Sequence, residues 1–181
     1  MSETRHCVMV GLMGVGKSTV GAAVAGRLGW RFRDSDADIQ ADTGLTVREL
    51  RDRDGVDSMH AREARQLLDG LAAPEPSVIA AAASVADVPG CLDALRAPDV
   101  FVVWLQASPE LLAERFASSD DHRPAYGDST EGFLARQLAT RGAALGSVAD
   151  LSIDIAERTP DEVATIVLDG LGARDPGEVG R

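Results

Sequence analysis

Residues 11–18 read Gly11-Leu12-Met13-Gly14-Val15-Gly16-Lys17-Ser18, which fits the phosphate-binding pattern G-x-x-x-x-G-K-[ST]. The apolar residues 6–10 before it predict a buried strand, and residues 17–28 predict a helix that ends at Gly29. In such a strand–loop–helix unit, glycines let successive backbone N–H groups close around a phosphate, and the helix N-terminus attracts its negative charge. The stretch therefore predicts a nucleotide site within an α/β fold.

Lys17 is the only lysine in a chain whose Lys and Arg residues number 18. A compact ammonium on a flexible stem suits a position where the phosphate oxygens of ATP must be bridged. The hydroxyl of Ser18, next to it, is predicted to ligate Mg²⁺. The residues predicted to bind ATP from this part of the chain are Gly11, Met13, Gly14, Val15, Gly16, Lys17, Ser18 and Thr19.

An acidic corner, Asp34-Ser35-Asp36, follows a predicted strand at residues 30–33. It lies at the carboxyl end of the sheet, where ligands of open α/β proteins bind. Alternate residues of an extended segment point the same way, so both carboxylates are expected on one side. One is expected to reach the Mg²⁺ shell through water and the other to accept the proton of an acceptor hydroxyl. The alternative is a polar turn that caps the next helix.

The rest of the chain repeats the alternation of strands and helices. Apolar runs predict strands at residues 77–81, 100–105 and 151–155, and helical patterns cover residues 37–42, 46–53, 56–71 and segments that start at Pro109 and Pro160. This order predicts a three-layer α/β/α P-loop kinase fold with a parallel sheet of about five strands. Residues 1–171 are expected to form a single domain, with a mobile lid at about residues 117–128 and a disordered tail at residues 172–181.

The composition excludes several classes of partner. The 181 residues carry a formal net charge of −11, which repels nucleic-acid backbones and anionic membrane surfaces. The apolar runs are far shorter than the ~20 residues that span a bilayer, and the first residues do not resemble a secretory signal. Cys7 and Cys91 lie in apolar settings that suit buried thiols in a reducing compartment. We therefore expect a cytoplasmic monomer with a small-molecule partner and no nucleic-acid or membrane partner.

The phosphate loop resembles that of the shikimate kinases, small P-loop kinases that transfer the γ-phosphoryl group of ATP to a hydroxyl of shikimate. The likeness extends over about residues 7–171 and includes Asp34-Ser35-Asp36 ahead of Ile39 and Thr43-Gly44. The resemblance implies that Asp34 belongs to the Mg²⁺ shell. It also implies that Asp36 contacts the acceptor hydroxyls and is the candidate base.

Four arginines fall where that family has functional arginines. The resemblance places Arg115 near the adenine, Arg123 in a mobile lid that closes over the phosphates, and Arg158 in an adenine-holding loop. Arg141 lies where the family has an arginine that contacts the shikimate carboxylate. The catalytic residues expected on this basis are Lys17, Asp36 and Arg123.

The acceptor side departs from the family. His60 stands where an arginine is expected to hold the carboxylate of the acceptor, and Arg62 faces elsewhere because two residues along a helix turn a side chain by about 200°. Ala82 and Ala83 replace glycines that let the backbone approach the acceptor. The residues expected to contact the acceptor are Asp36, His60, Ala82, Ala83 and Arg141. These departures predict a small polyhydroxylated acceptor other than shikimate.

Three other hypotheses fit the sequence. A functioning shikimate kinase with an altered pocket would use Arg141 and a shifted arginine as anchors. A gluconate-kinase-like enzyme would share the phosphate loop and residues 29–32, although the His-Pro expected after the acidic corner is missing. A degenerate nucleotide-binding module would bind ATP and phosphorylate nothing.

Overall fold

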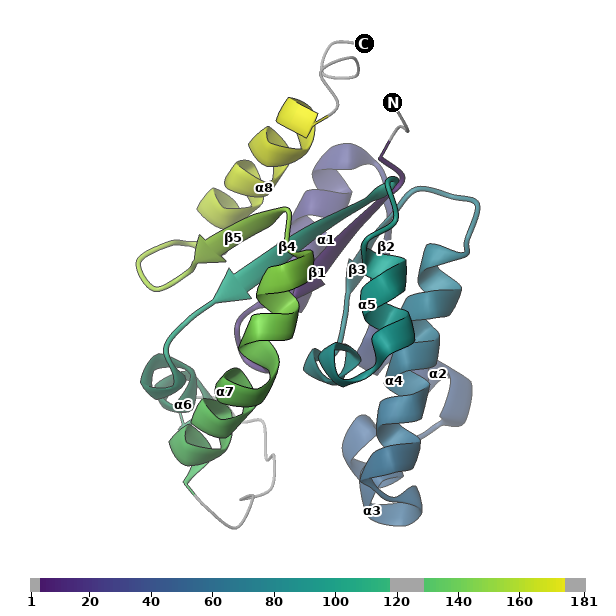
Figure 1. Cartoon of the computed structure of the whole chain (residues 1–181), viewed down its shortest axis with the longest axis vertical. Helices are drawn as coiled ribbons and strands as arrows, with labels where there is room; N and C mark the ends of the chain where they lie inside the picture. The colour runs from purple at the N-terminus through teal and green to yellow at the C-terminus, as the bar shows by residue number, and fades with distance from the viewer. Residues whose placement is uncertain (1–3, 118–128, 175–181) are drawn as a thin grey trace.

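A parallel sheet of five strands forms the centre of the computed structural model, which describes residues 4–117 and 129–174 (Figure 1). The strand order is β2-β3-β1-β4-β5, and every neighbouring pair is parallel. The strands are β1 (His6–Val10), β2 (Arg31–Asp34), β3 (Ser77–Ala80), β4 (Val100–Gln106) and β5 (Leu151–Asp154). Each strand begins and ends within one residue of the predicted bounds. The predicted α/β/α fold is confirmed.

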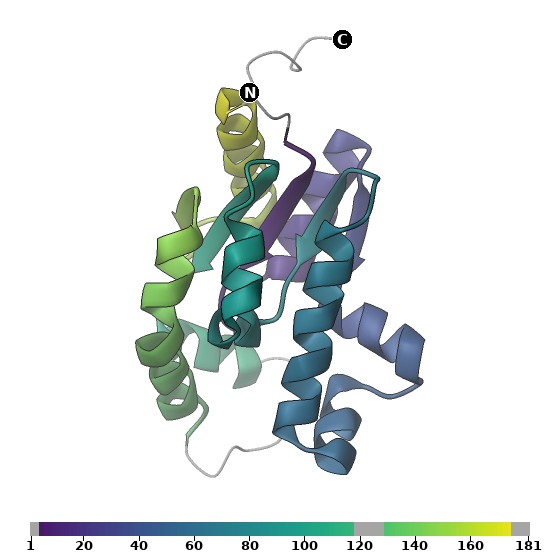
Figure 2. The same cartoon turned by 45° about the vertical axis from the view of Figure 1, so that its right-hand side comes forward.

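Helices cover both faces of the sheet because its strands are apolar on both sides (Figure 2). Along β1, Cys7 and Met9 belong to the core on one face, whereas Val8 and Val10 belong to the core on the other. Each of these side chains is fully buried, and burial of a Val or Met side chain contributes roughly 1.5–3 kcal/mol. The first face is covered by α1 (Lys17–Leu28) and α8 (Pro160–Arg174), the second by α4 (Val56–Leu71), α5 (Pro89–Leu95) and α7 (Thr130–Val148).

Four further helices flank the end of the sheet where the loops after β1, β2 and β3 emerge (Figure 1). They are α2 (Ser35–Thr43), α3 (Val47–Asp54), the 3₁₀ helix η1 (Ala83–Asp87) and α6 (Pro109–Ala117). α2 and α3 lie against one half of α4, and α6 lies against α7. The loops at this end of the sheet therefore face two groups of helices.

Local signals fix the helix boundaries that the sequence predicted. α1 ends at Leu28, and its C-cap is Gly29, whose φ of 67° is the left-handed conformation that favours glycine. α3 starts with a capping box, in which the Glu49 N–H donates to the Thr46 hydroxyl at 3.2 Å and the Thr46 N–H donates to the Glu49 carboxylate at 2.8 Å. α4 has the predicted bounds. The helices η1, α5 and α7 were not predicted.

The predicted tail begins too early. α8 continues beyond Leu171 to Arg174, whose Nη1 donates to the carbonyl oxygen of Val100 at 2.7 Å and lies 2.9 Å from Oδ2 of Asp150. The guanidinium also lies 5.7 Å from the ring centroid of Phe101. These contacts anchor the last turn of the helix, so residues 172–174 of the predicted tail are helical, and residues 175–181 lie outside the described residues. The predicted lid lies outside the described residues, apart from Ala117 at the end of α6.

Both cysteines are buried free thiols, as predicted. Cys7 on β1 and Cys91 on α5 have exposed fractions of 0%. Burial raises the pKa of the Cys7 thiol to about 12, and the nearby carboxylate of Asp150 adds to the rise. Among the described residues, no helix is both long enough and apolar enough to cross a membrane.

Candidate active site

The phosphate loop joins β1 to α1, and its glycines adopt backbone conformations that other residues rarely reach. Gly11, Gly14 and Gly16 have φ angles of 142°, 79° and 96°. A Cβ atom on Gly11 would lie 2.5 Å from the carbonyl oxygen of Leu105, so no larger residue fits there. Gly16 has open space around it, and there the φ angle alone favours glycine. These glycines let the loop turn tightly beneath its ligand.

Lys17 folds back over this loop. Its Nζ atom donates to the carbonyl oxygens of Gly11 at 2.9 Å and Leu12 at 3.0 Å. α1 has no acidic residue in its first turn, so no side chain of that turn neutralises the positive end of its dipole. Ser18 and Thr19 are exposed in the same turn. The loop, the ammonium and the helix N-terminus together form a set of donors that fits a nucleotide phosphate.

Asp34 and Asp36 both reach the site. The prediction that they belong to one extended segment is wrong. α2 begins at Ser35, and Asp34 is its N-cap, because Oδ1 of Asp34 accepts hydrogen bonds from the N–H groups of Asp36 at 3.0 Å and Ala37 at 3.3 Å. The capping alternative is therefore confirmed for Asp34. Asp36 lies in the first turn of α2, and both carboxylates line the same cavity.

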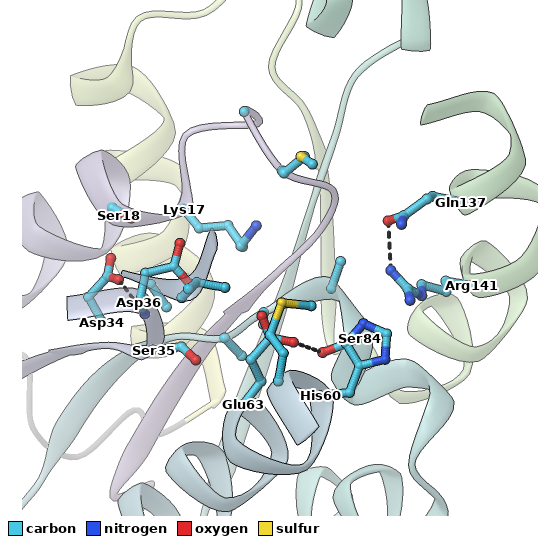
Figure 3. Close-up of a pocket in the computed structure, with 18 of the residues that line it drawn as sticks. Lys17, Ser18, Asp34, Ser35, Asp36, His60, Glu63, Ser84, Gln137 and Arg141 are labelled. Atoms are coloured by element: carbon cyan, nitrogen blue, oxygen red, sulfur yellow. Dashed lines mark hydrogen bonds between the residues drawn. The ribbon is translucent and has the colours of Figure 1, made fainter. Parts of the chain in front are cut away.

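A cavity of about 470 Å³ lies between the phosphate loop, the acidic corner, α3, α4, the loop after β3, and α7. Figure 3 shows Lys17, Asp34 and Asp36 on one side of it and Gln137 with Arg141 on the opposite side. Within the phosphate loop, Gly11 and Val15 are buried and do not line the cavity, although both were predicted to bind ATP. The predicted residues that do line it are Met13, Gly14, Gly16, Lys17, Ser18, Thr19, Asp34, Asp36, His60, Ala82, Ala83 and Arg141.

The oxygens beside the loop fit a magnesium site with few protein ligands. Within the described ranges, no group of three or more His, Cys, Asp or Glu side chains is placed to hold a metal ion. Mg²⁺ in kinases is usually held by one or two protein oxygens together with water and substrate phosphates. Ser18 and Asp34 line the cavity and have such oxygens. The buried hydroxyl of Ser35, which lines the same cavity, has no hydrogen-bond partner in the part of the chain that the structure describes.

Glu63 on α4 is a site residue that was not predicted from the sequence. It is 6% exposed, lines the cavity and accepts a hydrogen bond from the hydroxyl of Ser84. Burial raises the pKa of Glu63 to about 7. The Ser84 bond lowers this pKa, the carboxylate of Asp36 raises it, and the cations of Arg141 and Lys17 lower it. A carboxyl group that is half protonated at neutral pH donates hydrogen bonds as well as accepting them.

His60 shares a face of α4 with Glu63, because residues three positions apart on a helix are neighbours. Burial and the nearby cation of Arg141 lower the pKa of His60, against nearby carboxylates that raise it. The imidazole is therefore neutral at pH 7. Arg62 is exposed and does not line the cavity, as predicted. The helical spacing that placed Arg62 away from the site also places Glu63 in it, and this was the available signal.

Arg141 on α7 is 8% exposed. Its Nε and Nη2 atoms donate to Oδ2 of Asp87 at 2.9 Å and 2.6 Å, and its Nη1 atom donates to Oε1 of Gln137 at 2.6 Å. Neither partner was predicted. Gln137 lies one helical turn before Arg141, but Asp87 is 54 residues away, and no local pattern connects the two.

Two other predicted arginines, Arg158 and Arg115, do not line this cavity. Arg158 precedes α8, where its Nη1 donates to the carbonyl oxygen of Asp154 at 2.5 Å, and it lines a second cavity of about 500 Å³ with Glu157 and Glu162. Arg115 on α6 lines neither of these two cavities. Arg123 lies outside the described residues.

A parallel sheet with a phosphate loop at its carboxyl end, and two carboxylates beside that loop at a cavity of small-molecule size, defines a P-loop kinase of small molecules. Such an enzyme needs ATP on the loop and an acceptor beside the carboxylates. Residues 13–171 match the family model for shikimate kinase. The chain belongs to the shikimate kinase family and is an ATP-dependent small-molecule kinase.

Known proteins similar to this chain include shikimate kinases and a gluconokinase. The shikimate kinase of Synechococcus sp. (strain RCC307) is 34% identical over 164 residues, which cover 90% of this chain and 82% of that protein. The shikimate kinase from Acinetobacter baumannii in complex with shikimate has a TM-score of 0.85 at 24% identity and covers 97% of this chain and 96% of that chain. A gluconokinase from Sinorhizobium meliloti 1021 has a TM-score of 0.62 at 27% identity and covers 95% of this chain and 94% of that chain. The family resemblance predicted from the sequence is confirmed.

Proposed function

We propose that this enzyme transfers the γ-phosphoryl group of Mg-ATP to a hydroxyl group of a small polyhydroxylated acceptor other than shikimate. One observation carries the proposal: α4 presents to the cavity a neutral imidazole, His60, and a carboxyl group, Glu63, that is bonded to Ser84, and no cation. The cation that α3 brings to this cavity, Arg51, donates to Oδ1 of Asp52 at 3.0 Å and 2.7 Å. An acceptor carboxylate that loses a charge-assisted partner loses about 1.5–3 kcal/mol, or one to two decades of affinity. Ala82 and Ala83 further narrow the acceptor side where glycines were expected.

The nucleotide side supports phosphoryl transfer. Lys17 and the N-terminus of α1 are proposed to hold the β- and γ-phosphates, with Nζ of Lys17 exchanging its two carbonyl partners for phosphate oxygens. Ser18 and Asp34 are proposed to hold Mg²⁺, which neutralises charge on the phosphoryl oxygens when it is bound. The second oxygen of Asp34 suits this role because the helix cap uses only Oδ1.

Asp36 is proposed to orient the acceptor hydroxyl and accept its proton. The hydroxyl oxygen forms a bond to the γ-phosphorus while the bond to the β–γ bridging oxygen breaks, and ADP leaves with that electron pair. Figure 3 shows Asp36 on the same side of the cavity as Lys17, which places the base beside the proposed phosphate site. Arg141 is proposed to contact the acceptor from the opposite wall.

Three arginines complete the proposal. Arg115 and Arg158 are proposed to flank the adenine, and Arg123 is proposed to stabilise charge on the transferring phosphoryl group. The role of Arg123 is based on the family resemblance alone. We also propose that the enzyme acts as a monomer in the cytoplasm, where the buried free thiols of Cys7 and Cys91 stay reduced.

The release of ADP, coupled to detection of the phosphorylated product, tests the proposal. Mg-ATP is supplied with shikimate or with members of a panel of small polyols, and Lys17→Ala serves as the inactive control. We expect turnover with a panel member, little turnover with shikimate, and none in the control. Shikimate-dependent turnover that disappears in Lys17→Ala refutes the different acceptor. Nucleotide binding without turnover on any acceptor indicates a degenerate module instead.

Gluconate belongs in that panel. The similarity to a gluconokinase, at 27% identity over most of both chains, favours a sugar acid as a second candidate class of acceptor. Gluconate has a carboxylate, so its turnover would also show that the cavity accepts an acid despite His60.

A further inference from the structure

The guanidinium of Arg141 is already occupied by a carboxylate of the same chain. Nε and Nη2 form the edge of a guanidinium that binds carboxylates side-on, and both atoms donate to Oδ2 of Asp87, at 2.9 Å and 2.6 Å. The other edge is partly used, since Nη1 donates to Oε1 of Gln137 at 2.6 Å (Figure 3). Three of the five N–H groups therefore have partners within the chain, and two remain for a ligand.

The packing around this pair keeps it together. Arg141 is 8% exposed, and Asp87 is the last residue of η1, which packs directly against α7. η1 continues from Ala82, so the loop that narrows the acceptor side also supplies the internal carboxylate. The Asp87 side chain is 44% exposed, so the buried member of the pair is the guanidinium. A ligand carboxylate that displaces Asp87 keeps the cation paired, but its gain is offset by the two charge-assisted hydrogen bonds that Asp87 gives up.

We propose that Asp87 is a specificity-determining residue, which fills the carboxylate position at Arg141 and so selects acceptors with an uncharged hydrogen-bonding group there. This inference rests on the proposed function of the cavity as an acceptor site. An acceptor carboxylate must either displace Asp87 or lie beside it, and two carboxylates on one cation repel each other. A hydroxyl group accepts a hydrogen bond from a remaining N–H of Arg141 and leaves the ion pair intact.

Two probes separate these cases: shikimate, which has a carboxylate, and its uncharged methyl ester. Their binding to the full chain is measured by isothermal titration calorimetry without nucleotide. The wild type is expected to bind the ester at least as tightly as the acid. Asp87→Asn keeps the shape and one acceptor oxygen but removes the charge. It is expected to bind shikimate roughly 10- to 100-fold more tightly than the wild type and to bind the ester with little change.

Asp93→Asn is the matched control, because it removes an exposed carboxylate that pairs with Arg96 at 3.1 Å on the surface of α5. It is expected to leave both affinities unchanged. The inference is overturned by a wild type that binds the acid tenfold more tightly than the ester or does not bind the ester. It is also overturned by a folded Asp87→Asn that gains no affinity for the acid. If circular dichroism shows that Asp87→Asn does not fold, the ratio of the acid and ester affinities of the wild type decides.

These binding measurements require no phosphoryl transfer. Failure of the turnover experiment would refute the proposed function and leave the ratio of acid to ester affinities intact. A reversed ratio would refute the role of Asp87 and leave turnover on another acceptor intact.

Discussion

The buried carboxyl group of Glu63 makes the stability of this enzyme depend on pH in a calculable way. Burial raises its pKa from 4.5 to about 7, so the folded chain binds a proton more tightly than the unfolded chain. The resulting stabilisation is complete below pH 4.5, and it is lost as the pH rises through 7. At 1.36 kcal/mol for each unit of pKa, the whole effect is about 3 kcal/mol, of which about 2–3 kcal/mol is lost between pH 5 and pH 8.

Glu63→Gln removes this titration and keeps a group that can bond to the hydroxyl of Ser84. Urea unfolding followed by circular dichroism, at several values between pH 5 and pH 8, gives the free energy of unfolding of each variant. We expect Glu63→Gln to gain about 2–3 kcal/mol on the wild type across this range. Glu114→Gln removes an exposed carboxylate from α6, and it is expected to follow the wild type. A difference between Glu63→Gln and the wild type that does not change with pH would refute the argument from burial.

Three further predictions concern other parts of the fold. Gly21→Ala places a Cβ atom 2.8 Å from the ring of Phe32 and is expected to lower the free energy of unfolding by about 1 kcal/mol. Gly26→Ala, in the same helix, places its Cβ atom where no other atom lies within 4 Å and is expected to raise that free energy by about 0.5–1 kcal/mol. Equal effects of the two variants in urea unfolding would contradict the packing argument. Asp34→Ala removes a helix cap and is expected to lower the free energy of unfolding by about 1 kcal/mol. Asp34→Asn keeps the cap, and it is expected only to raise the Mg²⁺ concentration that turnover requires, which a magnesium titration measures. With a pKa of about 12, Cys7 is expected to react with a disulfide reagent at pH 8 only after unfolding, and rapid labelling of the folded enzyme would disprove its burial.

Most of the fold was predictable because its strands are buried on both faces and its early helices have local end signals. The runs that became β1, β3 and β4 are almost entirely buried, so their apolar character is continuous along the chain. The helix α7 lacks such a signal, since its buried positions include the charged residue Arg141 among apolar ones. α5 is only 7 residues long, too short for a helical period to show.

The candidate site, like the fold, has one part that the sequence predicts and one part that it does not. The phosphate loop is contiguous in sequence, and its glycines, lysine and serine identify its chemistry without any structure. The acceptor side is assembled from distant segments, as the bonds from Ser84 to Glu63, 21 residues apart, and from Arg141 to Asp87, 54 residues apart, show. Side-chain pairs formed only by tertiary packing leave no spacing that a single sequence reveals. The predicted geometry of the acidic corner was wrong because β2 ends at Asp34, two residues before Asp36, and Asp34 caps the helix that begins at Ser35.

The solitary lysine of this chain has a practical use. Because no other residue has an ε-amino group, reductive methylation with ¹³C-formaldehyde installs a single side-chain reporter, and it does so at the phosphate loop. The methyl resonances of that reporter would sense whether Nζ lies against the carbonyl oxygens of Gly11 and Leu12 or has moved to another partner. Nuclear magnetic resonance titrations then follow occupancy of the loop by candidate nucleotides without an acceptor or turnover, once the signal of the N-terminal α-amino group, which the same reaction methylates, has been told apart.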